Sequence, residues 1–390
     1  MIDETARRSA SIRLGGTFGA LFLYVGVFLP FWAVWLQYTG LTPVEIGLVM
    51  TVPYVLKPVI PLISTQLADH IGRVKPIFLA NLALTFLLFI PYLFVDSFWG
   101  ILLVTLFLNL FFQPLMPLLD AMSVKQARYC GMHYGRVRSV GSVTFIITAF
   151  LIGLLIKNTD AGWVVPVALA CLAVILLVSL GLPPDPVEES EEEDMAAQGR
   201  KPLRRLLGDR RFIGFLIVVA LIQMSHGVYY TLGSVHWKNN GLDEDIIGML
   251  WGIGVVAEIL IFIFASEKIA KIGPMKALMF IALMGVVRWT TLGMTFSLPV
   301  LFLVQTIHGL TYGAAHLAAI YYIANRVPSF ASSTAQGLYS AVPMGIGMGM
   351  TTFLAGILYD GWQGKSYWVM AALCLLAFFI ANRSRSVASA

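Results

Sequence analysis

Long apolar segments constrain this chain more than any other feature of its sequence. Twelve of them approach or exceed the roughly 20 mostly apolar residues that a bilayer-spanning helix needs. They cover residues 15–37, 44–66, 76–95, 98–120, 136–157, 161–182, 210–235, 245–266, 275–296, 298–325, 333–358 and 365–382. Charged residues make up 12% of the chain, about half of the roughly 25% that is usual in soluble domains. The sequence therefore predicts an all-α polytopic membrane protein with twelve transmembrane helices.

One break in composition divides these segments six and six. Residues 183–209 open with prolines, continue with an acidic run and then turn basic, a pattern typical of a solvated linker. We therefore predict a six-helix bundle at 1–182, a charged cytoplasmic linker at 183–209 and a second six-helix bundle at 210–390.

The two halves carry a repeated sequence at a constant offset of 201 positions. Residues 40–60 align with residues 241–261, and IGRVK at 71–75 aligns with IGPMK at 272–276. In this register Lys57 falls opposite Glu258. Because an even number of helices separates the copies, both run in the same direction. Transporters built from two such halves bind substrate between them near the midplane, so the repeat favours a transporter.

The distribution of lysine and arginine predicts the orientation. Cytoplasmic loops carry an excess of these residues. With both termini and the linker in the cytoplasm, all but five of the 26 basic residues lie on that side or at its edge. The five exceptions are Lys57, Lys157, Lys238, Arg288 and Lys365. We therefore expect a multi-pass membrane protein with N and C termini in the cytoplasm.

Ionisable residues inside the second half form the first candidate site. Such groups are costly at membrane depth and usually mark a functional pathway. Glu258 lies deep in its segment, where it could take up and release a proton as a cavity is alternately hydrated, or form a structural ion pair with Arg288. His308 and His316 are eight residues apart, about 80° around a helix, so both can face one cavity, with Tyr312 between them. We assign Glu258, Arg288, His308 and His316 to proton coupling and Tyr312 to substrate binding.

The first half provides candidates for substrate binding. Asp120 and Arg138 are expected to pair across neighbouring helices, although Arg138 could instead be a cytoplasmic topogenic charge. Lys57 lies between two prolines where its helix is expected to bend, and either cation could bind a carboxylate. Candidates for the rest of the site are the amide of Asn109 and the rings of Phe31 and Trp32, which could equally form an interfacial aromatic belt.

The loop after the second segment carries a recognisable pattern. TQLADHIGRVK at residues 65–75 resembles the loop signature of the major facilitator superfamily, with Thr65 in place of its first glycine. Gly72 permits a tight turn, while Asp69 and Arg73 can pair and cap helix ends. The resemblance implies that Asp69, Gly72 and Arg73 form a gating loop.

Several further stretches extend the likeness over nearly the whole chain. VFLPFWAVWL, GLTPVEIGL, NLFFQPLMPLLDA, YGRVRSVGSV, WGIGVVAEILIF, GVVRW and HLAAIYYIA resemble the 3-phenylpropionate transporter family of Gram-negative bacteria. That family belongs to the group of the major facilitator superfamily that is similar to lactose permease and linked to protons. The resemblance implies two pseudo-symmetric six-helix bundles and proton-coupled import across the bacterial inner membrane.

Lactose permease suggests roles for individual residues. There a glutamate on helix 8, an arginine on helix 9 and a histidine on helix 10 couple protons, and an acid on helix 4 with an arginine on helix 5 holds substrate. The same types recur here; the residues are Glu258, Arg288, His308 or His316, Asp120 and Arg138. The permease's carboxylate on helix 10 has no counterpart, because residues 298–325 contain no Asp or Glu.

We therefore predict a proton symporter for a small, aromatic carboxylate, with a sugar, oligosaccharide or nucleoside as the alternative cargo. A receptor or membrane enzyme is the remote alternative, because the chain lacks GxxxxGK[ST], HExxH and nucleophile-elbow motifs. Three dispersed cysteines suggest neither a disulfide framework nor a zinc site. We expect no cofactor or metal apart from the coupling proton, no nucleic-acid partner, and a monomer in the bilayer that binds a small-molecule substrate.

Overall fold

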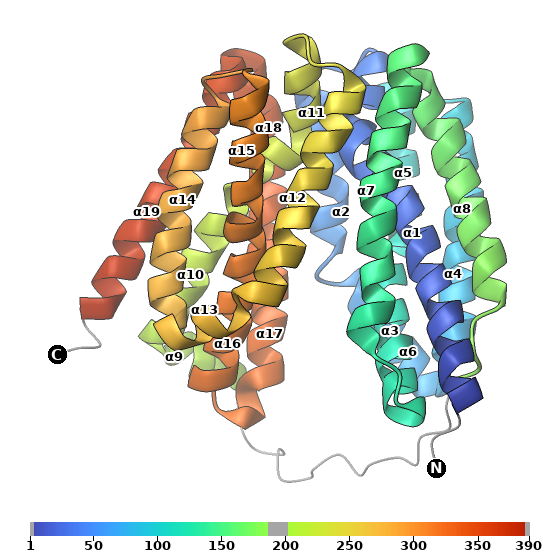
Figure 1. Cartoon of the computed structure of the whole chain (residues 1–390), viewed down its shortest axis with the longest axis horizontal. Coiled ribbons are helices and arrows are strands. Elements are labelled where there is room, and N and C mark those ends of the chain that lie inside the picture. The colour runs from blue at the N-terminus through green and yellow to red at the C-terminus, as the bar shows by residue number, and fades with distance from the viewer. Residues whose placement is uncertain (1–3, 186–201, 387–390) are drawn as a thin grey trace. The chain divides into compact units, whose positions relative to one another are not determined.

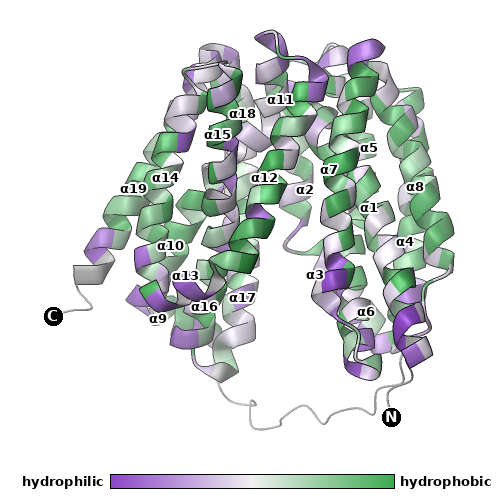
Figure 2. Ribbon diagram, in the orientation of Figure 1, coloured by the Kyte–Doolittle hydropathy of each residue, from purple (hydrophilic) through white to green (hydrophobic). Residues whose placement is uncertain are grey.

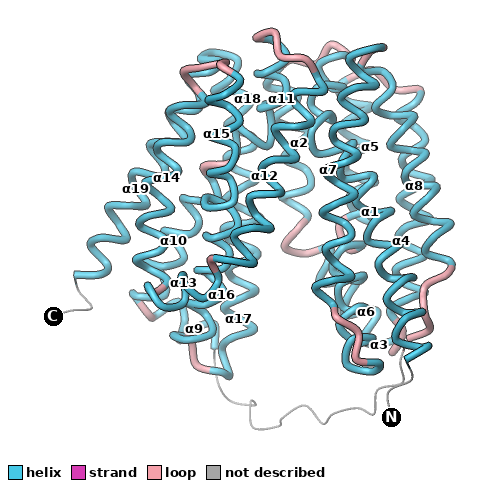
Figure 3. The backbone as a smooth tube through the Cα atoms, viewed as in Figure 1, coloured by secondary structure: helices cyan, strands magenta, loops and turns pink. Residues whose placement is uncertain are grey.

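The computed structural model describes residues 4–185 and 202–386, and within these ranges the chain is helical with no strand. Short loops join the helices (Figure 3). Eleven helical stretches there are long and apolar enough to cross a membrane, and the last of them, Ser332–Arg383, spans 52 residues and contains two of the predicted segments. Hydrophobic residues cover the middle of the helices and hydrophilic ones gather near their ends (Figure 2). The predicted all-α polytopic class is confirmed.

The chain forms two compact units. Unit 1 is Met1–Ser190 with Gly241–Gly252, and unit 2 is Glu191–Asn240 with Ile253–Ala390. The predicted division at 182 and 210 stays a prediction, and most of the predicted linker, residues 186–201, lies outside the described residues. The helix that carries Glu258 contributes to both units, because its residues up to Gly252 belong to unit 1.

Unit 1 contains eight α-helices and the first part of a ninth (Figure 1). They are α1 (Glu4–Tyr38), α2 (Pro43–Leu56), α3 (Ile60–Ile71), α4 (Val74–Phe89), α5 (Phe98–Phe112), α6 (Leu115–Cys130), α7 (Tyr134–Asn158), α8 (Val164–Leu180) and the start of α12 (Glu244–Phe264). Two predicted spans are broken near a proline, which lacks the N–H that an α-helix needs. One break lies between α2 and α3 beside Pro58, and the other lies between α5 and α6 at Pro114.

Unit 2 contains the remaining helices. They are α9 (Pro202–Gly208), α10 (Arg210–Met224), α11 (Gly227–Asn239), the rest of α12, α13 (Ser266–Ile272), α14 (Pro274–Leu292), α15 (Leu298–His308), α16 (Ala315–Arg326), α17 (Ser332–Ala341), α18 (Met348–Trp362) and α19 (Ser366–Ser386). Two π-helical segments interrupt this series, η4 (Gly309–Ala314) between α15 and α16 and η6 (Val342–Gly347) between α17 and α18. Such segments are rare and are found frequently at functional sites.

The aligned glycines of the repeat make equivalent contacts inside their own units. Gly26 on α1 faces α7, where an added Cβ would lie 2.8 Å from Cβ of Thr148. Gly227 on α11 faces α18, where an added Cβ would lie 2.7 Å from Cβ of Thr351. In each unit a glycine therefore lets two helices approach closely against a threonine, as small residues do in membrane helix pairs.

The first part of α12 packs tightly against α7 within unit 1. A Cβ on Gly153 would overlap the backbone oxygen of Glu244, and one on Gly248 would overlap that of Ala149. At the end of α7, Lys157 Nζ lies 2.8 Å from Asp243 Oδ2 and 3.1 Å from Asp245 Oδ2. Glycine contacts and exposed ion pairs thus fix the start of the helix that carries Glu258.

Candidate functional site

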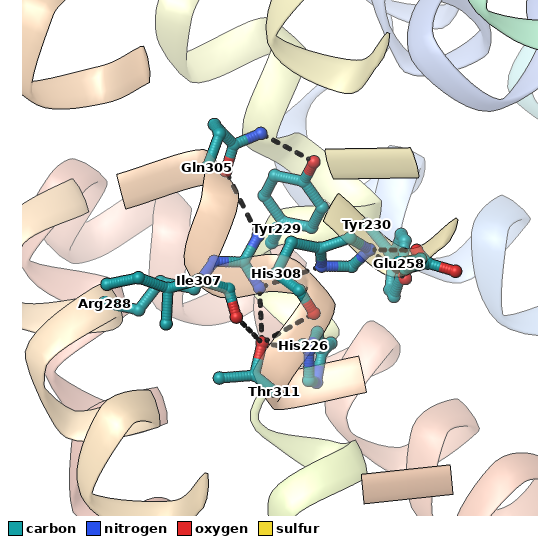
Figure 4. Close-up of polar contacts among 9 residues, drawn as sticks. All are labelled: His226, Tyr229, Tyr230, Glu258, Arg288, Gln305, Ile307, His308 and Thr311. Carbon is teal, nitrogen blue, oxygen red and sulfur yellow. Dashed lines mark hydrogen bonds and ion pairs between the residues drawn. The ribbon is translucent and has the colours of Figure 1, made fainter. Parts of the chain in front are cut away.

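Five elements of unit 2 bring polar side chains together in one buried cluster (Figure 4). The cap and first turn of α11 provide His226, Tyr229 and Tyr230, α12 provides Glu258, α14 provides Arg288, α15 provides Gln305 and His308, and η4 provides Thr311. Arg288 is 0% exposed and His308 is 3% exposed, so these charges and dipoles interact with little screening by water.

Arg288 is the centre of this cluster. Its Nη1 donates to Thr311 Oγ1 at 2.9 Å and lies 3.0 Å from His308 Nδ1, and its Nη2 donates to Gln305 Oε1 at 3.1 Å. The guanidinium carbon also lies 4.7 Å from the ring centroid of Tyr229 and 4.3 Å from that of Trp289. Hydrogen bonds and aromatic faces therefore compensate a cation that would otherwise be very costly to bury.

The position of Arg288 determines the tautomer of His308. A guanidinium has only donors, so His308 Nδ1 must accept and cannot carry a proton in this arrangement. The ring proton then resides on Nε2, which lies 2.8 Å from Glu258 Oε1 and donates to that carboxylate. His308 is thus a neutral bridge between Arg288 and Glu258, and the carboxylate of Glu258 accepts the last hydrogen bond of the series.

Two further series of hydrogen bonds run outward from Arg288. Gln305 Nε2 donates to Tyr229 Oη at 2.9 Å. His226 Nδ1 lies 3.1 Å from the carbonyl oxygen of Ile222, which can only accept, so the proton of His226 is on Nδ1. Its Nε2 lies 3.3 Å from Thr311 Oγ1, whose one hydroxyl hydrogen is also within reach of the carbonyl oxygens of Ile307 and His308. The arginine therefore fixes the tautomer of His308, and the carbonyl of Ile222 fixes that of His226.

A glycine allows α12 to reach this cluster. Gly309 follows His308, and a Cβ there would lie 2.5 Å from the carbonyl oxygen of Ala257 and 3.0 Å from the backbone nitrogen of Glu258. Any larger residue would push apart the backbones that carry Glu258 and His308. The close approach therefore places the carboxylate within reach of the imidazole.

Gly309→Ala is expected to destabilise the protein by about 1–3 kcal/mol and to slow transport, because overpacking displaces α12 from η4. Gly337→Ala on α17 is the matched control, since nothing lies within 4 Å of its added Cβ. There the loss of a helical glycine should stabilise slightly. Thermal unfolding of both purified variants checks this, and equal unfolding midpoints would contradict it.

Three of the four predicted coupling residues are in direct contact in the structure. His308 contacts both Arg288 and Glu258, so the histidine lies in the series between the acid and the arginine. His316 lies on α16 and makes a hydrogen bond of 2.9 Å with Tyr339 Oη on α17. Tyr312 stacks on the His308 ring, with centroids 5.5 Å apart and planes 13° from parallel.

In unit 1 the structure places Asp120 beside Arg138. Asp120 Oδ1 accepts from Tyr134 Oη at 2.9 Å and lies 3.9 Å from Arg138 Nε. The contact is therefore long, and the side chains of Asp120 and Arg138 are 36% and 32% exposed. The guanidinium carbon of Arg138 lies 4.5 Å from the ring centroid of Phe22 and 5.3 Å from that of Phe18. The guanidinium of Arg138 therefore lies beside two aromatic rings.

The other predicted substrate residues of unit 1 have different surroundings. Lys57 is the half-buried residue that ends α2 at the predicted bend. Asn109 is buried and donates to the carbonyl oxygen of Thr105, and its Oδ1 lies 3.4 Å from Gln113 Nε2. Phe31 is 0% exposed and Trp32 is 1% exposed, so both belong to the core. Their role in a substrate wall stays a prediction.

The predicted gating loop has the expected turn. Gly72 has φ of 71°, the left-handed conformation that glycine adopts at little cost, and its N–H donates to the carbonyl of Asp69. Arg73 is extended and directly precedes α4. The loop thus ends one helix and starts the next within a few residues, and its function in gating stays a prediction.

The sequence prediction missed several members of the unit 2 cluster. Gln305 is three residues before His308, a spacing that places residues of an α-helix on one face, whereas Thr311 lies in the π-helical segment η4. That signal was available, whereas the packing of Tyr229 and Tyr230 against the cluster depends on helices distant in the chain. Among the described residues there is no group of three or more His, Cys, Asp or Glu that could hold a metal ion.

Comparisons with known proteins agree with this architecture. The model of the MFS_1 like family matches residues 12–370. The chain is 35% identical over 372 residues to a protein of Escherichia coli K12 described as a probable 3-phenylpropionic acid transporter, covering 94% of this chain and 95% of that protein. It is 25% identical to the maltose permease of Geobacillus stearothermophilus, over 95% of this chain and 92% of that one.

A solved structure shows the same fold. The crystal structure of the nucleoside transporter NupG matches with a TM-score of 0.84 at 15% sequence identity, covering 96% of this chain and 98% of that chain. These relatives are transporters and not enzymes, and the predicted major facilitator fold is confirmed. The chain therefore belongs to the MFS_1 like family and is a multi-pass membrane transporter of the major facilitator superfamily.

Proposed function

We propose that this protein is a proton-coupled symporter that imports a small aromatic carboxylate, such as a phenylpropionate, across the bacterial inner membrane. The observation that carries the proposal is the buried series Arg288–His308–Glu258 in unit 2. A fully buried arginine linked to one carboxylate through a neutral histidine is the arrangement expected of a reversible proton site.

Proton uptake acts on the contact between Glu258 and His308. Protonation of the carboxylate removes the charge that receives the Nε2–H of His308, which weakens that hydrogen bond. The contact between α12 and α15 is then looser, and deprotonation restores it. Coupling requires only that the two states of this contact favour different conformations of the transporter.

Arg138 supports the choice of a carboxylate as cargo. Its long, partly exposed contact with Asp120 leaves the guanidinium able to bind a substrate carboxylate, and the rings of Phe22 and Phe18 provide aromatic surface beside it. The probable 3-phenylpropionic acid transporter, 35% identical to this chain, is named for a ligand of this kind. Lys57 is the second candidate cation.

Arg138→Gln is expected to raise the KM for the carboxylate by about 10- to 100-fold, the range for loss of one charged hydrogen bond. Binding of the corresponding neutral amide should change little. Arg128→Gln, which removes an exposed charge from the end of α6, is the matched control. Uptake kinetics with both ligands measure the two KM values. An equal rise in KM for the acid and the amide would contradict a role of Arg138 in carboxylate binding.

The experiment that tests the proposed function is uptake of labelled phenylpropionate by cells that express the protein. We expect accumulation above the external concentration, and we expect an uncoupler that dissipates the proton gradient to abolish it. Accumulation that survives the uncoupler would refute proton coupling. Extrusion of the substrate against its own concentration gradient, driven by an inward proton gradient, would refute import.

A sugar or nucleoside is the second candidate cargo. The similarity to a maltose permease and the structural match to a nucleoside transporter favour it. In unit 1 the acceptor Asp120 and the amide of Asn109 are groups that bind hydroxyls. Uptake of a labelled disaccharide or nucleoside in place of the aromatic acid would select this alternative.

The remaining predictions belong to the same proposal. The coupling proton needs no cofactor, and we propose a monomer with both termini in the cytoplasm and without a nucleic-acid partner. In this orientation the gating loop of Asp69, Gly72 and Arg73 lies on the cytoplasmic side.

A further inference from the structure

A hollow of about 680 Å³ lies between the start of α1 and the start of α7 in unit 1, separate from both candidate sites. Its lining residues are Glu4, Arg7, Arg8, Ser11, Ile12, Gly15, Gly16, His133, Arg136, Val137 and Val140. The candidate membrane spans of the two helices begin at Arg7 and at Tyr134. The hollow is therefore at the level where a bilayer has its headgroups, whichever side that is.

The charge of the hollow is strongly positive. Three arginines line it against one carboxylate, Glu4, which pairs with Arg7 at 3.2 Å. Within the described ranges, Arg8 and Arg136 have no carboxylate within 4 Å. A smaller hollow of about 290 Å³ shares Arg8 and Ile12 and adds Arg13. The site thus offers cations from two helices to an anion.

Apolar surface continues from these cations into the membrane. Ile12 is 65% exposed and Val140 is 41% exposed at the hollow. Along α7 the exposed positions Val143, Ile147 and Leu151 follow Val140 at spacings of three and four residues, which places them on one face. A ligand with a phosphate at one end and a hydrocarbon chain at the other matches this arrangement.

We propose that this hollow binds an anionic phospholipid, with its phosphate between Arg8 and Arg136 and an acyl chain along the exposed face of α7. Arginine binds phosphate oxygens through charge-assisted hydrogen bonds. Basic pockets beside transmembrane helices on the cytoplasmic side, where anionic lipids are enriched, bind such headgroups. The positive charge selects an anionic over a zwitterionic lipid, and the apolar face selects a lipid over free phosphate.

The test is native mass spectrometry of the purified full-length protein titrated with phosphatidylglycerol and with phosphatidylcholine of the same acyl chains. We expect tighter binding of phosphatidylglycerol. Each basic residue near an anionic surface contributes roughly a factor of five, so the double variant Arg8→Gln/Arg136→Gln should bind it about 25-fold more weakly. The matched control Lys276→Gln/Arg326→Gln, which removes two exposed charges from unit 2, should bind as the unaltered protein does.

Three results would overturn the proposal: equal binding of the two lipids, an equal loss in the control, or displacement of the lipid by glycerol phosphate at matched concentration. The last would identify a phosphate site without a lipid. Ile12→Glu provides a second variant, because it places a negative charge in the hollow at an exposed position without disturbing the core. If the double variant does not remain monodisperse, retained lipid binding by Ile12→Glu refutes the site and lost binding supports it.

Discussion

Glu258→Gln is expected to abolish uphill accumulation of substrate while leaving exchange of substrate across the membrane intact. Glutamine keeps the shape of the side chain and can still accept the Nε2–H of His308, so the contact across α12 and α15 is retained. It cannot take up a proton. A transporter held in one protonation state can equilibrate its cargo but cannot draw on the proton gradient. Uptake into energised cells and exchange in proteoliposomes measure the two activities separately.

The control is Glu267→Gln on α13, where the side chain is 87% exposed and lies 3.9 Å from Lys271. It removes one carboxylate from the same unit and should leave accumulation unchanged. Exchange by Glu258→Gln should also lose the pH dependence of the unaltered protein. Uphill uptake by Glu258→Gln that an uncoupler still abolishes would remove Glu258 from the mechanism.

Arg288→Met is expected to have the largest effect on stability. The substitution leaves Gln305 Oε1, Thr311 Oγ1 and His308 Nδ1 without their buried donor, and leaves the charge of Glu258 uncompensated. Breaking a buried charge network by removing one partner costs about 3–5 kcal/mol. We expect a marked fall in the thermal unfolding midpoint of the purified protein and no detectable uptake.

The double variant Glu258→Gln/Arg288→Met separates the two consequences. Removal of the acid as well leaves no unpaired charge, so part of the lost stability should return while uptake stays absent. Arg326→Met, at an exposed position on α16, should change stability by no more than about 0.5 kcal/mol. Additive losses in the double variant would show that Glu258 and Arg288 are not energetically coupled.

The fold was predictable because it depends on features that the sequence displays directly. Segment length predicted the membrane helices, and the prolines beside Lys57 marked the break between α2 and α3. The pairing of Asp120 with Arg138 was also expected, since two unlike charges on neighbouring helices rarely stay apart in an apolar medium. Two short interior segments, η4 and η6, carry no comparable signal in composition.

The detail of the cluster was less predictable for a geometric reason. Counting at 3.6 residues per turn placed His308 and His316 on one face, but the π-helix Gly309–Ala314 lies between them. A π-helix bonds residue i to residue i+5 and so has more residues per turn than an α-helix. Counting at 3.6 residues per turn therefore does not give the angle between the two histidines. Whether His308 or His316 would contact Arg288 depended on this π-helical backbone and on Gly309, which lets α12 approach closely.

The lack of a second acid in the cluster has an electrical consequence. Residues 298–326, which bring His308 and Gln305 to Arg288, contain neither Asp nor Glu, and Glu258 is the one carboxylate among the described residues drawn in Figure 4. If one such group carries one proton inward with each monovalent carboxylate anion, the cycle transfers no net charge. Import would then follow the pH difference across the membrane and be indifferent to its voltage. Symport of one proton with a neutral sugar would instead move one positive charge inward in every cycle.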